Sequence, residues 1–261
     1  MDQKILGRRI KFFRERAHLS QLELETSIDA SAGMISRIEK GRVNPTKETV
    51  GKIAEILHLH NMETDYLIGN TAEPPTQAEI DKAKNAVKDY FSKGDVFAYL
   101  SDDRWRVNAV SKGFYNLFKS YVDDPDKAVD NLIGTSIVNI LLEEEYQILQ
   151  FFKKENYKEL LKYQLVKFHS GMGFMHDDMI YKQSMSSIER DPLARSIWEQ
   201  IKEDKSIPNK ETREIFFTIK GINIGFNYSK EQLYANPRFY LIEYQPKNKY
   251  LRIILKLLNA H

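Results

Sequence analysis

The chain has 261 residues, of which 42% are hydrophobic and 29% are charged, and this length favours two folded units. It contains no cysteine, which excludes disulfide scaffolds, zinc–thiolate sites and thiol chemistry. The N-terminus lacks the apolar segment of a signal peptide, and no stretch approaches the roughly 18 apolar residues that a membrane span needs, so we expect a cytoplasmic protein.

The net charge of +2 hides a local asymmetry along the chain. Residues 1–52 contain eleven Lys or Arg against seven Asp or Glu, whereas residues 53–90 contain three against seven. A phosphate backbone responds to a local basic patch more than to the total charge. The composition of residues 1–52 therefore favours a nucleic-acid partner.

The first two predicted helices are marked by an apolar face and by a capping motif. Leu6, Ile10 and Phe13 recur at helical spacing among several arginines. Ser20 and Glu23 form a capping box, in which each side chain accepts a hydrogen bond from a backbone N–H group at the start of the second helix. We expect this helix to end near residue 29.

Three more elements complete the first predicted unit. After about three residues a third helix is expected, with Ser31 as its N-cap and Gly41 in the left-handed position at its end. Thr46 is the expected cap of a fourth helix. A short turn, TDYLIG, then closes an all-α unit of five short helices at Gly69.

The rest of the chain predicts a linker helix and an α+β domain. Residues 70–77 are polar and contain a Pro-Pro pair, and an amphipathic helix that ends before Gly94 follows them. The stretch VFAYLSDDRWRVNAV predicts a hairpin, residues 128–204 are helical in pattern, and EIFFTIKGINIGFNYS and RFYLIEYQP predict strands. We assign residues 1–70, 71–94 and 95–261 to the first domain, the linker with its helix, and the second domain.

The first segment resembles the Cro and phage-repressor type of helix-turn-helix regulator, the XRE family. Its motif residues are Leu6-Gly7-Arg8-Arg9-Ile10, Leu19-Ser20-Gln21 with Leu24, and Ile35-Ser36-Arg37-Ile38-Glu39 with Gly41 and Pro45. Two positions depart from the family pattern. Glu25 stands where a small alanine is usual, and Asp29, which tolerates left-handed geometry, stands where the turn usually has glycine.

This resemblance implies that the helix beginning at Ser31 lies in the major groove of an operator. The implied DNA-binding residues are Gln21, Ser31, Ala32, Gly33, Ser36, Arg37, Lys40, Arg42 and Arg9. Arg14 and Glu39 resemble a family pair, and we expect them to form an ion pair within the domain. Ala32 and Gly33 have little to read bases with, so hydrogen bonding to bases would fall mainly to Ser31, Ser36 and Arg37, with DNA shape adding specificity.

The stretch DDRWRVNAVSKGFYNLF, residues 102–118, resembles the opening of the PAS-like ligand-binding domain of MmyB-like regulators. The resemblance implies an antiparallel sheet with covering helices over an apolar cavity, and a small hydrophobic ligand such as a fatty acid. Met172, Met175 and Met179 share a helical face, which suits an irregular apolar pocket because methionine is flexible, and a soft core helix explains that pattern equally well. The candidate ligand-binding residues are Phe114, Phe118, Met172, Met175, Met179 and Trp198.

The leading interpretation is a homodimeric regulator that binds double-stranded DNA and responds to a ligand. The alternative is a helix-turn-helix regulator whose C-terminal domain serves dimerisation or protein interaction without a small molecule. We expect no enzyme activity, since the zinc-peptidase motif His-Glu-x-x-His is absent from the sequence. We expect no metal and no cofactor either, because His169 and His176 lack a third ligand.

Overall fold

The structure, a computed structural model, describes residues 3–69, 73–119, 122–146, 151–203, 214–219 and 222–247. The chain divides into two compact units, which are described separately. The first comprises Met1–Pro74 and Gly173–His176, and the second comprises Pro75–Met172 and Asp177–His261. The boundary lies inside the predicted linker, and the amphipathic helix that follows belongs to the second unit.

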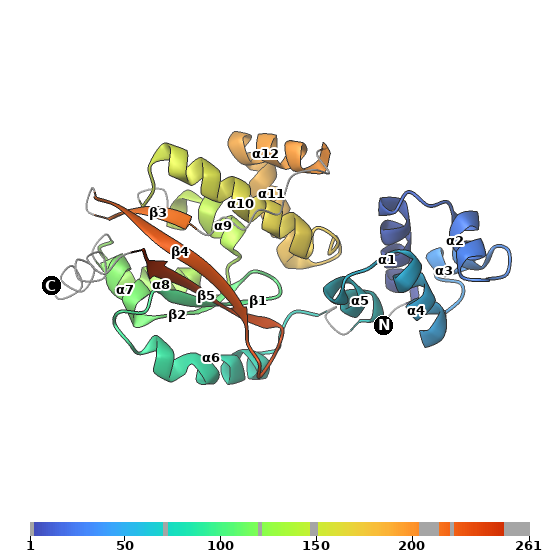
Figure 1. Ribbon diagram of the computed structural model, residues 1–261, viewed down its shortest axis with the longest axis horizontal. Coiled ribbons are helices and arrows are strands. Elements are labelled where there is room, and N and C mark those ends of the chain that lie inside the picture. Colours follow the sequence, from blue (N-terminus) through green and yellow to red (C-terminus); the bar gives the residue numbers. More distant parts are fainter. Residues whose placement is uncertain are drawn as a thin grey trace. The chain divides into compact units, whose positions relative to one another are not determined.

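The described part of the first unit contains five short helices, as the sequence predicts (Figure 1). The expected TDYLIG turn is the second half of a helix, which ends at the left-handed Gly69 (φ +93°). Glu63 in its first turn accepts a hydrogen bond from the His60 backbone N–H at 3.0 Å, which fixes the helix start at residue 61. The helices are α1 (Gln3–Arg16), α2 (Gln21–Ser27), α3 (Met34–Glu39), α4 (Lys47–Ile56) and α5 (Asn61–Ile68).

The core of the first unit joins α1 to α3. The apolar residues predicted for this core are buried, with Ile10, Ile35 and Ile38 fully enclosed. Gly7 allows the close approach of the two helices, because a Cβ atom at this position would lie 2.3 Å from the Ile38 carbonyl oxygen. The close packing of α1 on α3 therefore explains the glycine in the Leu-Gly-x-x-Ile motif of α1.

The second unit is an antiparallel sheet with helices on both faces (Figure 1). The strand order is β2-β1-β5-β4-β3, and every neighbouring pair is antiparallel. This arrangement confirms the predicted α+β class, while the PAS-like assignment stays a prediction. The elements are α6 (Gln77–Phe91), β1 (Ala98–Asp102), β2 (Val107–Val110), α7 (Lys112–Lys119), α8 (Pro125–Leu132), α9 (Ile137–Leu142), η1 (Glu144–Tyr146), α10 (Lys154–Met172), α11 (Met179–Arg190), α12 (Pro192–Glu203), β3 (Glu214–Ile219), β4 (Ile222–Gln232) and β5 (Phe239–Pro246).

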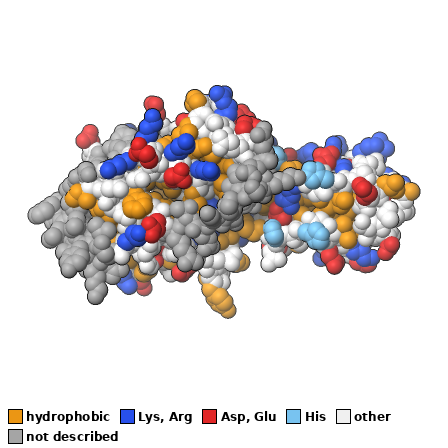
Figure 2. All heavy atoms as spheres, turned by 45° about the horizontal axis from the view of Figure 1, so that its top comes forward, with side chains coloured by type: hydrophobic (Ala, Val, Ile, Leu, Met, Phe, Trp, Pro, Cys, Tyr) orange, Lys and Arg blue, Asp and Glu red, His pale blue; other side chains and the backbone are white. Residues whose placement is uncertain are grey.

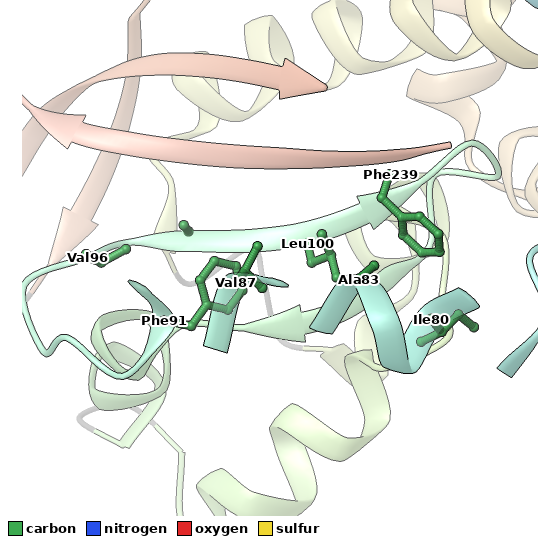
Figure 3. Close-up of a cluster of buried hydrophobic side chains, with 8 residues drawn as sticks. Ile80, Ala83, Val87, Phe91, Val96, Leu100 and Phe239 are labelled. Carbon is green, nitrogen blue, oxygen red and sulfur yellow. The ribbon is translucent and has the colours of Figure 1, made fainter. Parts of the chain in front are cut away.

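Helix α6 packs along one face of the sheet (Figure 3). Its buried residues lie on one side of the helix and contact alternate residues of β1, Ala98 and Leu100, together with Phe239 of β5. Successive strand residues point to opposite faces, so Tyr99 of β1 points to the other face of the sheet. Helix α6 is therefore an integral part of the second unit.

A cluster of buried charges lies at one end of the sheet, around the turn between β1 and β2. Arg104 is fully buried, and its Nε donates to Asp178 Oδ2 at 2.8 Å, while its NH1 lies 3.1 Å from Asp103 Oδ1. Asp178 also caps α11 by accepting from the Ile180 backbone N–H at 2.8 Å. Burial raises the pKa of Asp103, although Arg104 and Arg238 beside it act in the opposite direction. The cluster ties the hairpin to the start of α11.

We predict that Asp178→Ala lowers the free energy of unfolding of the second unit by about 3 kcal/mol. The substitution removes one carboxylate from a fully buried guanidinium, and Asp103 compensates only in part. Both tryptophans, Trp105 and Trp198, lie in this unit, so urea unfolding followed by tryptophan fluorescence reports on it.

Asp130→Ala is the matched control, because Asp130 is exposed on α8. Its effect is expected to stay within about 0.5 kcal/mol. Equal unfolding midpoints for the two variants would contradict a stabilising role for the Arg104–Asp178 pair.

Candidate nucleic-acid interface and apolar cavity

Helices α2 and α3 form the helix-turn-helix core of the first unit. The capping box at the start of α2 is confirmed, since the Glu23 backbone N–H donates to Ser20 Oγ at 3.1 Å and the Ser20 N–H donates to Glu23 Oε2 at 2.7 Å. Asp29 takes the left-handed conformation expected of it (φ +54°). The connection is longer than predicted, since residues 28–33 lie between the two helices.

The predicted start of the third helix is wrong. Helix α3 begins at Met34, its N-cap is Gly33 in the left-handed conformation (φ +75°), and Ser31 makes no cap. Ser31 and Ala32 therefore precede the helix and are exposed in the connection. Gly33 has a conformational role, because side chains on other residues disfavour this φ.

Glu25 supplies the cap that Ser31 does not. Its carboxylate accepts hydrogen bonds from the backbone N–H of Gly33 at 3.0 Å and from that of Ile35 at 2.8 Å. Glu25 is 5% exposed, so a side chain on α2 satisfies, from within the core, the N–H of the N-cap Gly33 and one of the first N–H groups of α3. The sequence shows that Glu25 departs from the usual alanine. It does not show the hydrogen-bond partners of Glu25, because these lie eight and ten residues further along the chain.

Arg37 lies over the small residue at the start of α3. A Cβ atom on Gly33 would be 3.6 Å from the Arg37 guanidinium nitrogen NH1. The side chain of Arg37 is exposed, one turn along α3. This distance is an ordinary van der Waals contact, so it does not require glycine, but it places the Arg37 guanidinium at the N-terminal end of the helix, where a helix-turn-helix reads bases.

The expected ion pair between Arg14 and Glu39 is confirmed. Arg14 Nε donates to Glu39 Oε1 at 2.6 Å, and this pairing raises the pKa of Arg14. Gln21, which was predicted to hold a phosphate, donates from Nε2 to Glu39 Oε2 at 2.6 Å. Glu39 thus links α1, α2 and α3, and the amide of Gln21 is oriented within the domain.

Arg9 does not belong to the accessible basic surface, and we correct that prediction. It is 7% exposed, its NH1 donates to the Tyr66 carbonyl oxygen at 2.7 Å, and its guanidinium carbon lies 3.8 Å from the centre of the Tyr66 ring. These contacts fix α5 against α1. Phosphate binding by Arg9 would require breaking them.

The remaining candidates form a polar and basic surface on and around α3. On the face of the molecule drawn in Figure 2, basic side chains of the first unit are interspersed with acidic ones. The exposed candidates are Ser31, Ala32, Arg37, Lys40 and Arg42, and the partly buried ones are Gln21, Gly33 and Ser36.

The second unit contains an apolar cavity of about 80 Å³. It lies on the sheet face opposite α6, since Tyr99 lines it, and residues of α7, α8, α9 and α10 complete its wall. Two of the predicted ligand residues, Phe114 and Phe118, line it. The full lining is Tyr99, Val107, Val110, Phe114, Leu117, Phe118, Leu132, Ile137, Ile140, Leu141, Phe151, Phe152, Leu160, Gln164, Phe217 and Tyr244.

The other predicted ligand residues lie outside this lining. Met172 ends α10, Met175 follows in the connection, and Met179 begins α11, so the expected common helical face does not exist. Met172, Met175 and Trp198 are buried, whereas Met179 is 70% exposed. A helix break after residue 172 was not visible in the apolar pattern. The position of the cavity moves the candidate ligand site to the aromatic residues of α7 and the sheet.

Comparison with known proteins identifies the class of the first unit. Residues 10–60 match a helix-turn-helix family model. Over 59 residues the chain is 37% identical to the "ImmF control region 10 kDa protein" of Bacillus phage phi105. That alignment covers 23% of this chain and 66% of the phage protein, so the chain spans just under two thirds of that relative. Among the described residues, no helix combines the length and apolarity needed to cross a membrane.

We predict that Glu25→Ala increases hydrogen exchange of the amides in α3. Loss of the carboxylate leaves the N–H groups of Gly33 and Ile35 without their acceptor, at a cost of about 1–3 kcal/mol. Mass spectrometry of peptides that cover residues 33–39 measures the change in exchange rate.

Two further variants make this measurement specific. Glu25→Gln keeps one carbonyl acceptor and is expected to retain part of the protection, whereas Glu55→Ala removes an exposed carboxylate on α4 and is expected to change nothing in α3. Unchanged exchange in Glu25→Ala would show that water replaces the cap without cost.

Proposed function

We propose that this protein is a sequence-specific DNA-binding transcriptional regulator and that its first unit contacts DNA through α3. The observation that carries the proposal is the exposed set Arg37, Lys40 and Arg42, on and directly after a helix that Glu25 and Glu39 fix to the rest of the domain. A recognition helix must keep its position while its exposed side chains approach base edges. The helix-turn-helix match of residues 10–60 supports the same role.

The accessible residues divide into two kinds of contact. Arg37, beside the N-terminal end of α3, is placed to donate to base edges, and Ser31 and Ser36 flank it. Lys40 and Arg42 follow the helix and carry charge suited to phosphates. Gln21 contributes through the backbone N–H groups at the start of α2, since Glu39 holds its amide.

The proposed regulator acts as a homodimer on a two-fold symmetric operator, as dimeric helix-turn-helix proteins do. Its second unit binds a small hydrophobic ligand in the apolar cavity, and binding shifts the equilibrium between dimer geometries that differ in affinity for DNA. The proposal includes no catalytic step. In the alternative function, the second unit joins copies or partners and the cavity stays empty.

Selection of binding sequences from random DNA tests the regulator and the dimer together. The expected result is two related half-sites whose centres lie about one helical turn, roughly 34 Å, apart. A single half-site without symmetry would contradict the dimer, and failure to enrich any sequence would contradict specific DNA binding.

We predict that Arg37→Ala and Lys40→Ala weaken DNA binding in different ways. Arg37→Ala is expected to reduce discrimination between the selected site and its mismatched versions by about 1–3 kcal/mol. Lys40→Ala is expected to weaken all sequences equally and to lower the salt slope by about one, because one phosphate contact is lost. Fluorescence anisotropy titrations over a range of salt concentrations measure both effects.

Lys202→Ala is the matched control for these titrations, because Lys202 is a half-exposed lysine on α12 of the second unit. It is expected to leave affinity and salt slope unchanged. If Arg37→Ala and Lys40→Ala behave alike, the assignment of bases to Arg37 and phosphates to Lys40 is wrong.

A further inference from the structure

The apolar cavity is lined by a buried amide residue. Gln164 on α10 is 3% exposed and lines the cavity, and its side chain has no hydrogen-bond partner among the described residues. Because Gln164 borders the cavity, a molecule inside the cavity can supply the hydrogen bond that the protein does not. Buried side-chain amides are nearly always satisfied, so this position needs an explanation.

The rest of the cavity wall, as far as the structure describes it, carries no charge. Among the described residues that line it, the other polar side chains are Tyr99 and Tyr244, and burial raises the pKa of both hydroxyls above the ordinary tyrosine value. Both groups are therefore neutral at physiological pH. A ligand inside this wall meets an amide, hydroxyl groups, and aromatic and aliphatic surface.

This composition selects against an ionised ligand. A carboxylate in the cavity would lose its hydration without gaining a counter-charge, which is strongly unfavourable. A neutral hydroxyl, by contrast, can exchange hydrogen bonds with the free amide of Gln164. The uncharged wall thus argues against the fatty-acid head group that the sequence resemblance implies.

Size and shape restrict the ligand further. The cavity of about 80 Å³ is smaller than the roughly 150 Å³ apolar cavity known to accept benzene, so a ligand larger than a single ring is excluded, and even a single ring requires the wall to expand. Aromatic side chains of α7, β1, β3 and β5 line it, among them Phe114 and Phe217, together with Phe151 and Phe152 ahead of α10. Rings pack edge-to-face against such a wall, as Phe114 and Tyr244 already do.

We propose that the cavity binds a small neutral aromatic molecule that carries a hydroxyl group, and that Gln164 selects it through a hydrogen bond to that hydroxyl. The inference rests on the proposed ligand-binding role of the second unit. It does not depend on DNA binding by the first unit.

Three ligands of similar size test the proposal on the full-length protein without DNA. Isothermal titration calorimetry compares phenol with toluene, in which a methyl group replaces the hydroxyl, and with benzoate, which carries a charge. Phenol is expected to bind about tenfold more tightly than toluene, because toluene leaves the amide unpaired. Benzoate is expected to give no measurable binding.

The Gln164→Met variant assigns the preference to one side chain. It is expected to bind phenol and toluene equally, and to unfold at a higher urea concentration than the wild type, because the unpaired amide is gone. A purely structural amide would give the opposite shift in the midpoint. Gln200→Met, an exposed position on α12, is the matched control and is expected to change neither property.

Each other outcome overturns the proposal. Equal wild-type affinities for phenol and toluene would remove the role of Gln164, binding of benzoate would contradict the neutral ligand, and no binding of any of the three would leave the cavity without this function. DNA affinity of the same samples is measured separately, so loss of operator binding counts against the proposed regulator and not against the ligand.

Discussion

The carboxylate of Glu25 is the contact on which the proposed DNA-reading surface depends. It accepts from the backbone N–H groups of Gly33, the N-cap, and Ile35 from inside the core, so a helix as short as Met34–Glu39 keeps a defined start. Glu39 fixes the other end of α3 by pairing with Arg14 and holding Gln21. With both ends anchored, the exposed side chains of α3 can approach DNA without any need for the helix to form on binding.

Two buried polar side chains of the second unit differ in whether they have hydrogen-bond partners. Arg104 is fully enclosed, and Asp178 and Asp103 lie beside it, so the charge is compensated where the hairpin meets α11. Gln164 is nearly as deeply buried, yet it lines an apolar cavity, and no hydrogen bond joins its side chain to another described residue. A satisfied buried charge serves the fold, whereas an unsatisfied amide in a cavity fits a binding site better than a structural role.

Local signals predicted much of the fold. The caps at Ser20 and Thr46 are confirmed because each involves residues only three positions apart. Apolar periodicity identified the buried faces of α1 and α6, because residues three or four positions apart share one face of a helix. The start of α3 was missed because its cap comes from Glu25, and the methionine face was misplaced because a helix break follows Met172.

The sequence by itself determined the helix-turn-helix class, the α+β class of the second unit and the exposure of the basic side chains Arg37 and Lys40. Motif spacing and the hydrophobic period are enough to predict these features. The tertiary structure decided which polar residues are available. Arg9 is of a residue type that commonly binds phosphate, but packing encloses it against Tyr66. Gln164 looks like an ordinary helix residue, but the sheet and three other helices enclose it beside a cavity. Burial and pairing depend on contacts between distant parts of the chain, and no local pattern records them.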